Sequence, residues 1–178
     1  LDIACVEFEQ VSGQWQFSVL AAECHPYSDD WAKRLRDATR LPAREYLLLH
    51  SAYGHYMGES VNQFIREKEL QFKVQLISSH GHTTFHVPES KMTAQLGDGA
   101  AIAAVTGIHT VSDLRAMDVA LGGQGAPVVP IGDQLLWPGY DYYLNLGGIA
   151  NITWYVKGQP IAFDVCPANR VLNMLSAI

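Results

Sequence analysis

The order of apolar and polar residues along this 178-residue chain predicts a mixture of strands and helices. Two short β-prone runs, residues 3–8 and 15–22, are separated by the turn signal Ser12-Gly13 and predict an antiparallel hairpin. A Ser-Asp-Asp sequence then caps a predicted helix over residues 31–38. A second, longer helix is predicted over residues 42–68, where apolar side chains recur at spacings of three and four and form one face.

Two glycines, Gly54 and Gly58, lie four residues apart in the long predicted helix. Glycine inside a helix costs about 1 kcal/mol relative to alanine, so something must compensate. The spacing of four places both glycines on one side of the helix. We therefore expect close packing against a neighbouring element there.

The middle of the chain predicts two further strands and a small helix. Residues 72–77 alternate between apolar and polar side chains, which predicts a strand. The histidine-rich segment 78–89 follows and has no helical period. Asp98 is a suitable cap for a helix over residues 99–106, which Gly107 stops. A short strand is predicted directly after it, over residues 108–112.

The last third contains a glycine-rich loop before Pro127 and then a second hairpin, residues 142–146 and 149–156, around Gly147-Gly148. A strand over residues 161–165 precedes a helix that begins near Pro167. This order predicts an α/β fold with a mixed sheet rather than a purely doubly wound one. We expect one domain over residues 1–138 and the beginning of a second, truncated domain over residues 139–178.

Composition removes several functional classes. Twelve basic and 18 acidic residues give a net charge of −6 with no basic cluster, which argues against a nucleic-acid partner. Three scattered cysteines form neither a disulfide framework nor a CxxC zinc motif, and reduced thiols indicate a cytoplasmic protein. The longest strongly apolar stretch, residues 100–105, is far shorter than the ~20 residues of a membrane span. The chain starts with neither Met nor a basic segment, so we expect no secretory signal.

The first candidate site is the histidine-rich segment, because it follows a predicted strand and ligands bind at the carboxyl ends of strands in α/β proteins. His80, His82 and His86 could ligate zinc, with Asp98 as a nearby carboxylate. The other interpretation is that these side chains hydrogen-bond to the backbone, or bind a ligand as neutral histidines.

The second candidate is the run Asp113-Leu-Arg115-Ala-Met-Asp118, which leads into the loop Leu-Gly-Gly-Gln-Gly-Ala-Pro. A carboxylate beside a loop with few Cβ atoms suits a general base, because the loop lets a ligand approach closely. The alternative is that either aspartate is a helix cap, or that Asp113 pairs with Arg115 across a turn.

The third candidate is the second hairpin and the strand after it. The adjacent glycines 147 and 148 can direct successive N–H groups into one concavity and cradle phosphate, or they can form an ordinary tight turn. The chain contains neither a Walker motif nor a GxGxxG sequence. Asp164, at a strand end, could meet a magnesium-bound phosphate through water, or it could cap the helix near Pro167.

Four segments together carry a family resemblance: HGHTTFHVPE, then QLGDGAAIAAVTGIHTVSDLR–MDVALGGQGAPVVP, then LNLGGIANIT, then FDVCPANRVLN. In this order they resemble the anhydro-N-acetylmuramic acid kinase family over nearly the whole chain past residue 72. The opening Leu-Asp-Ile-Ala also resembles the end of that family's first phosphate loop, GTSLDGxD, of which only Asp2 is present. Leu114 and Met117 stand where the family pattern has an aromatic and a more polar residue.

The resemblance implies an actin, sugar kinase and Hsp70-like (ribonuclease H-like) fold, with ATP bound in the cleft of two mixed-sheet domains and Mg²⁺ as the accompanying ion. It implies hydrolysis of the 1,6-anhydro bridge of the amino sugar coupled to phosphorylation of O6, a step of cell-wall recycling. Asp118 would be the general base. The sugar side would hold His80, Gly81, Thr83 and His86, with Asp98 and Arg115 close by. The phosphate side would hold Asn145, Gly147, Gly148, Asp164 and Asn169, and Mg-ATP would lie near Asp2 and Asp164.

The resemblance also implies a small-molecule amino sugar and ATP as partners, no nucleic acid or membrane, and by analogy a homodimer. Because the first phosphate loop is largely absent and the family's adenosine-binding part lies beyond residue 178, we expect the chain by itself to be inactive. Two other functions stay open: a metal-dependent hydrolase built on the three histidines, and a non-catalytic ligand-binding homologue.

Overall fold

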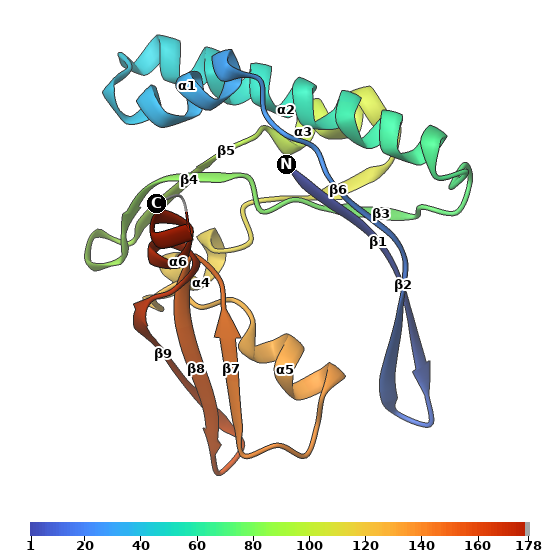
Figure 1. Ribbon diagram of the computed structural model, residues 1–178, viewed down its shortest axis with the longest axis vertical. Helices are drawn as coiled ribbons and strands as arrows, with labels where there is room; N and C mark the ends of the chain where they lie inside the picture. Colours follow the sequence, from blue (N-terminus) through green and yellow to red (C-terminus); the bar gives the residue numbers. More distant parts are fainter. Residues whose placement is uncertain (177–178) are drawn as a thin grey trace. The chain divides into compact units, whose positions relative to one another are not determined.

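The computed structural model describes residues 1–176 and shows a mixed α/β order of elements (Figure 1). Contacts divide the chain into two compact units. The first unit contains Leu1–Glu7 and Ser18–Gly125, and the second contains Phe8–Phe17 and the described residues from Ala126 onward. The α/β class expected from the sequence is confirmed, but among the described residues no sheet combines parallel and antiparallel pairs, so the predicted mixed sheet is not seen. The kinase-domain boundary at residues 138 and 139 stays a prediction.

The chain begins with the predicted hairpin, which is longer than the sequence suggested. Strand β1 (Asp2–Val11) pairs with β2 (Gln14–Cys24). The turn residues Ser12 and Gly13 both have positive φ, 52° and 81°. This left-handed conformation matches the twist of the two strands, and it explains why glycine occupies the second turn position.

Helices follow the hairpin as predicted: α1 (Asp29–Asp37), the 3₁₀ turn η1 (Ala38–Arg40) and the long α2 (Ala43–Glu67). The Ser28 hydroxyl accepts a hydrogen bond of 3.3 Å from the Trp31 amide and caps α1. The apolar face of α2 lies in the core of the first unit. The buried core cluster consists of Leu35, Ala38, Leu49, Tyr53, Met57, Leu96 and Ile102.

Helix α3 (Gly99–Thr106) packs closely against α2 through the two glycines of α2. A Cβ atom at Gly54 would lie 2.9 Å from the Ala101 Cβ, and one at Gly58 would lie 2.8 Å from the Val105 Cβ. Both separations are far below van der Waals contact, so only glycine lets the helices approach this closely. The prediction of a packed neighbour at these glycines is confirmed.

Two short parallel strands form a two-stranded sheet that positions the candidate site. Strand β3 (Leu76–Ser78) pairs with β6 (His109–Val111), with Leu76 opposite His109 and Ser78 opposite Val111. Because the strands are parallel and in register, their carboxyl ends lie at the same edge. The segments that follow them, residues 79–81 and 112–118, therefore start side by side.

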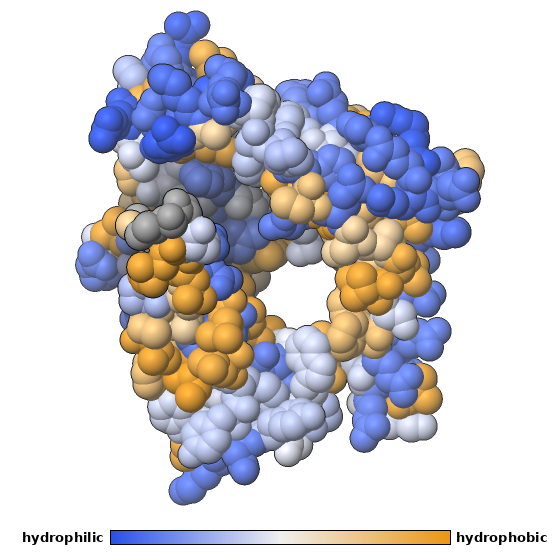
Figure 2. All heavy atoms as spheres, in the orientation of Figure 1, coloured by the Kyte–Doolittle hydropathy of each residue, from blue (hydrophilic) through white to orange (hydrophobic). Residues whose placement is uncertain are grey.

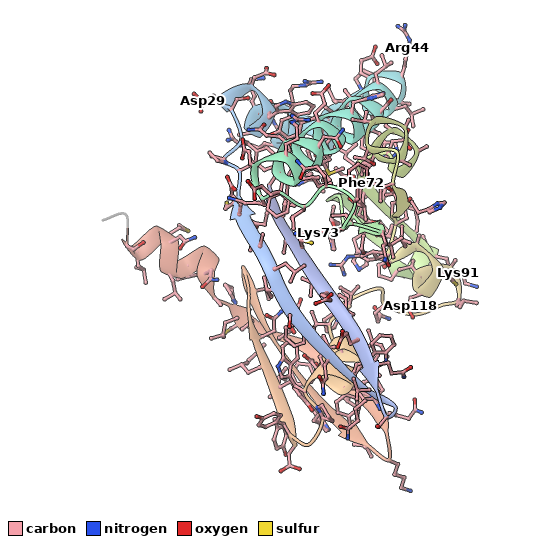
Figure 3. All side chains as sticks on the ribbon, turned by 90° about the vertical axis from the view of Figure 1, so that its right-hand side faces the viewer. Asp29, Arg44, Phe72, Lys73, Lys91 and Asp118 are labelled. Carbon is pink, nitrogen blue, oxygen red and sulfur yellow. The ribbon has the colours of Figure 1, made fainter. Side chains whose placement is uncertain are left out.

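The predicted strand over residues 72–77 is wrong in its first half. Phe72 is fully exposed and has a φ of 63°, and the Lys73 amide donates a hydrogen bond of 3.0 Å to the Leu70 carbonyl (Figure 3). The alternation of apolar and polar residues that predicted a strand thus begins inside a turn. The burial of Leu70 after helix α2 sets the conformation of this turn. Only residues from Leu76 onward pair in the sheet.

The histidine-rich segment contains a strand that the sequence analysis did not predict. Strand β4 (His82–Val87) pairs antiparallel with β5 (Met92–Leu96), and the 3₁₀ turn η2 (Pro88–Ser90) joins them. A register shift lies between Thr83 and Phe85. Pairing with β5 gives the backbone N–H and C=O groups of β4 their hydrogen-bond partners. The side chains of this segment show no regular period, so the pattern of apolar residues does not reveal the strand.

The second unit contains a three-stranded antiparallel sheet of β7 (Tyr142–Leu146), β8 (Ile149–Val156) and β9 (Gln159–Pro167). Helix α6 (Asn169–Ser176) follows the sheet, close to the predicted start. Helix α5 (Pro130–Leu136) has Pro130 in its first turn and was not predicted. The Tyr155 hydroxyl donates to the Pro130 carbonyl, so α5 covers the face of the sheet that carries Tyr155.

The opposite face of this sheet is apolar and largely open. Opposed residues Leu144, Ile152 and Phe163 share that face, and Leu144 and Phe163 are 61% and 49% exposed. Figure 2 shows apolar side chains gathered over β9 and its neighbourhood. Within residues 1–176, no helix is long and apolar enough to cross a membrane.

Candidate functional site

Three residues of the predicted sugar side lie after the carboxyl ends of the parallel strands β3 and β6. His80 follows β3 by two residues, whereas Arg115 and Asp118 follow β6. The Ser79 amide donates a hydrogen bond of 2.8 Å to the Val111 carbonyl and extends the pairing to this edge. Residues that are 35 positions apart in the sequence thereby meet where α/β proteins bind ligands.

The glycine-rich loop curls back over helix α4 (Ala116–Ala120) because of how that helix ends. The Gly123 amide donates to the Asp118 carbonyl at 2.8 Å, and the Gly122 amide donates to the Val119 carbonyl at 3.1 Å. This pair of bonds is the Schellman motif, which requires a left-handed residue just after the helix. Gly122 supplies it with a φ of 97°. The helix end therefore directs the loop toward the Asp118 side chain.

The Asp118 carboxylate is held by this loop (Figure 3). Its Oδ2 accepts a hydrogen bond of 2.7 Å from the Gly125 amide. A Cβ at position 123 would overlap all three carboxylate atoms of Asp118, so the loop lies directly against the side chain. Among the described residues, Gly125 alone donates to this carboxylate, and Asp118 is exposed. The arrangement fixes one oxygen of an exposed residue, and no described residue donates a hydrogen bond to the other oxygen.

Arg115 contacts both the glycine-rich loop and the segment that follows strand β3. Its Nη1 donates to the Gly125 carbonyl at 2.5 Å, and its Nε and Nη2 lie 3.2 and 3.0 Å from Nε2 of His80. A guanidinium only donates hydrogen bonds, so Nε2 of His80 is the acceptor and carries no hydrogen. The His80 proton is therefore on Nδ1, which lies 3.1 Å from the Gly81 carbonyl.

The other predicted sugar-side residues lie nearby in sequence but have partners of their own. Thr83 is exposed on β4, and Nδ1 of His86 on the same strand lies 3.1 Å from the Thr93 hydroxyl. Asp98 caps α3 by accepting a 2.9 Å hydrogen bond from the Ala100 amide. Gly81 has a φ of 70°, and a Cβ there would overlap the Leu96 carbonyl oxygen. In the described part of the chain, no hydrogen bond joins these four residues to Asp118.

The geometry offers nothing for the zinc alternative. Among residues 1–176, no three His, Cys, Asp or Glu side chains are grouped to hold a metal ion. Nε2 of His80 faces the cationic Arg115 side chain, and burial lowers the pKa of His82. The His82 side chain is half-buried, whereas His80 and His86 are exposed.

In the second unit, the structure aligns three polar residues across the sheet. Asn145 on β7 is opposite Asn151 on β8, which is opposite Asp164 on β9, so the three side chains share one face. The Asn151 Oδ1 is buried, and no described residue donates a hydrogen bond to it. The sequence analysis quoted Asn151 within a motif but did not select it, because only strand register reveals that it lies between Asn145 and Asp164.

The Gly147-Gly148 turn is tied to the start of helix α6. The carbonyls of Gly147 and Gly148 each accept a hydrogen bond of 3.0 Å, from the Asn169 and Ala168 amides respectively. The Asn169 side-chain amide also donates to the Leu146 carbonyl at 3.2 Å. Three predicted phosphate-side residues, Gly147, Gly148 and Asn169, are therefore in direct contact. The turn connects β7 and β8, and these hydrogen bonds attach it to the start of helix α6.

Two further carboxylates lie in distinct surroundings. Asp2 is exposed on β1, where its hydrogen bond with the Cys24 thiol raises the pKa of that thiol. Asp133 on α5 was not a candidate from the sequence. Burial raises the pKa of Asp133, and a hydrogen bond with Thr153 partly offsets the rise. Asp133 lines a cavity of about 550 Å³ that Asn145 also borders. The signal that could have identified Asp133 is its position three residues after Pro130.

The described residues form an α/β protein in which a carboxylate is held by a glycine-rich loop that follows a pair of parallel strands. A family model described as anhydro-N-acetylmuramic acid kinase matches residues 1–177. The chain belongs to this family, and the resemblance noted from the sequence motifs is confirmed.

Relatives named anhydro-N-acetylmuramic acid kinase support the assignment. The relative from Rhizorhabdus wittichii is 35% identical over 97% of this chain and 50% of its own length. The relative from Pseudoalteromonas translucida is 33% identical over 97% of this chain and 48% of its length. A relative from Paramagnetospirillum magneticum is 47% identical over 53% of this chain and 28% of its length. The chain thus spans about half the length of the first two relatives.

Proposed function

We propose that this chain forms the sugar-binding and base-carrying part of an enzyme that hydrolyses the 1,6-anhydro bridge of anhydro-N-acetylmuramic acid and phosphorylates its O6 with ATP. The product is N-acetylmuramic acid 6-phosphate. The observation that carries this proposal is the exposed Asp118 carboxylate, of which one oxygen accepts from the Gly125 amide and the other accepts from no described residue. Family membership supplies the substrates to be tested.

In the proposed reaction, Asp118 accepts a proton from a water molecule, and the water oxygen forms a bond to the anomeric carbon of the sugar. The bond between that carbon and O6 breaks, and O6 takes the γ-phosphoryl group while ADP leaves. His80, Gly81, Thr83 and His86 line the sugar side, with Asp98 and Arg115 near them.

The second unit supplies the phosphate side. Gly147 and Gly148 form a turn in which a Cβ would meet nothing closer than 3.5 Å, so the turn leaves room beside the backbone for a phosphate. Asn169 holds this turn through two hydrogen bonds. Asp2, on the first unit, is the remaining residue of the first phosphate loop.

The residues present fit a hydrated magnesium ion. Mg²⁺ prefers oxygen ligands and keeps several waters. Asn145, Asn151 and Asp164 offer amide and carboxylate oxygens on one face, and the buried Asn151 oxygen accepts no hydrogen bond within the described chain. Bound Mg²⁺ would neutralise charge on the transferred phosphate, and Asp164 and Asn151 would hold its water ligands.

The test uses the full-length enzyme encoded by the gene, supplied with the anhydro sugar, ATP and Mg²⁺. Mass spectrometry should detect a product heavier than the sugar by one water and one phosphoryl group. Asp118→Asn should abolish turnover and leave binding of both substrates unchanged, since it removes the base with little change in volume. Near-normal turnover by Asp118→Asn would assign the base elsewhere, with Asp113 next to be examined.

Two control measurements distinguish the other candidate functions. The 178-residue chain alone should give no product. ATP-dependent phosphorylation by this chain would contradict the proposal that it forms only the sugar-binding and base-carrying part of the enzyme. Binding of sugar and ATP by the full-length enzyme without any product would instead support a non-catalytic homologue. Activity that needs no ATP and is lost to a strong chelator would support a metal-dependent hydrolase.

A further inference from the structure

The Arg115 side chain directs its donors at two acceptors of the same unit. Nη1 lies 2.5 Å from the Gly125 carbonyl, and Nε and Nη2 both face Nε2 of His80. A guanidinium is planar and presents its donors in a fixed fork. The position of one acceptor therefore constrains the position of the other. Arg115 itself is half-buried, so these contacts are partly shielded from water.

Gly125 is the point at which this constraint reaches Asp118. Its carbonyl accepts from Arg115, while its amide donates to Oδ2 of Asp118 at 2.7 Å. Gly125 is buried with a φ of 64°, and a Cβ there would overlap the Val119 side chain and lie 3.3 Å from the Arg115 Cβ. The residue is thus packed on one side and hydrogen-bonded on two others.

We propose that Arg115 is a positioning residue, which fixes the Gly125 peptide and thereby the orientation of the Asp118 carboxylate, and at the same time fixes the His80 ring. The inference rests on the proposed function, in which Asp118 is the base. It gives Arg115 a role in holding other protein groups in place, in addition to its place near the sugar. Three of the five N–H groups of the guanidinium are directed at Gly125 and His80.

The contacts of Arg115 matter because the reaction depends on the direction in which the second carboxylate oxygen of Asp118 points. A displacement of about 1 Å in a catalytic group can cost about 100-fold in rate. Without Arg115, the loop would be held at this point by the helix end and by the single amide bond to Asp118. Sugar affinity would change little, because the His80 ring would keep the 3.1 Å contact between its Nδ1 and the Gly81 carbonyl.

The test compares Arg115→Ala and Arg115→Lys in the full-length enzyme, with Arg44→Ala as the matched control on an exposed position of α2. Arg115→Ala should lower kcat about 100-fold and leave the sugar KM within about threefold. Arg115→Lys should keep part of kcat, because one ammonium can reach one of the two acceptors. Millimolar guanidinium should restore part of the kcat of Arg115→Ala. Arg44→Ala should keep wild-type values.

A second readout does not depend on turnover. Hydrogen exchange at the Gly125 amide should become faster in Arg115→Ala and stay unchanged in Arg44→Ala. A raised sugar KM with kcat retained, or unchanged exchange at Gly125, would overturn the inference. Failure of the proposed function would appear differently, as absence of product from the wild-type enzyme.

Discussion

The Gly125 amide donates a 2.7 Å hydrogen bond to Oδ2 of Asp118, across a loop that the end of helix α4 folds back on itself. Two glycines that precede Gly125 in the loop allow this contact. Gly122 takes the left-handed conformation that ends the helix, and Gly123 lets the loop pass directly over the carboxylate. The loop therefore holds the Asp118 side chain in place. Four predictions test this contact and other features of the two units.

The first prediction concerns Gly123. In Gly123→Ala the added methyl would overlap the Asp118 carboxylate, so the side chain must move away from the Gly125 amide. We expect kcat to fall by about 100-fold while the sugar dissociation constant changes little. Steady-state kinetics and calorimetry of the full-length enzyme measure both. Gly132→Ala, where a Cβ would meet nothing within 4 Å, is the control and should keep normal kcat. A fully active Gly123→Ala would show that the Asp118 position is not critical.

The second prediction concerns the hairpin turn. Since a Cβ at Gly147 would lie 3.5 Å from the Ile149 carbonyl oxygen, an ordinary contact, the fold itself tolerates a side chain there. Gly147→Val should therefore leave the melting temperature nearly unchanged and weaken ATP binding, because the branched side chain occupies the proposed phosphate path. Titration with ATP decides the matter. An unchanged ATP affinity would mean that the turn serves the hairpin alone.

The third prediction concerns the contact of α2 with α3. Gly54→Ala places a methyl 2.9 Å from the Ala101 Cβ and against the Asp98 backbone, which cannot yield as a flexible side chain would. Overpacking of this kind costs about 1–3 kcal/mol of the free energy of unfolding. Denaturant unfolding provides the measurement. Gly132→Ala should instead stabilise by about 0.5–1 kcal/mol, because it replaces a helical glycine with open space around it. Equal stability of the two variants would refute the close-packing account.

The fourth prediction concerns pH and His82. Burial lowers the pKa of His82 in the folded protein, although a backbone hydrogen bond with Leu35 partly offsets the effect. The unfolded chain, with an ordinary pKa of about 6.5, binds the proton first as the pH falls. The contribution of His82 to stability is therefore complete above about pH 6.5 and is lost as the pH falls toward the lowered pKa of the folded state.

Urea unfolding at about pH 7.5 and about pH 5.5 measures this loss. His82→Gln should show a weaker dependence on pH than the wild type. His55→Gln removes an exposed histidine of α2 and should retain the wild-type dependence. If His82→Gln lost stability on acidification as steeply as the wild type, another group would be responsible.

Local chemistry was sufficient for most elements of this fold. The Ser12-Gly13 turn, the Ser28 and Asp98 caps and the stop at Gly107 depend on interactions within a few residues, so the sequence predicts the hairpin and helices correctly. The residue types also indicated Asp118 as a carboxylate beside a glycine-rich loop, but the hydrogen bond by which the loop holds it is seen only in the structure. Helix α2 was predictable because its apolar face repeats over 25 residues.

The errors and omissions have the opposite origin, since they depend on contacts between distant residues. Phe72 alternates like a strand residue, yet the burial of Leu70 against the preceding helix turns the chain there. Strand β4 exists because β5 pairs with it, and Asn151 joins Asn145 and Asp164 through the register of three strands. No property of these residues alone contains that information.

The amino-acid order thus specified the family, the local elements and the residue types of the site, because capping, turn formation and periodicity act over short distances along the chain. The folded chain alone decided which of those residues meet. It brought Arg115 to His80 and Gly125, since parallel pairing of β3 with β6 places two distant segments at one edge. Which side chains become partners depends on three-dimensional packing, and these contacts are the basis for the positioning role proposed for Arg115.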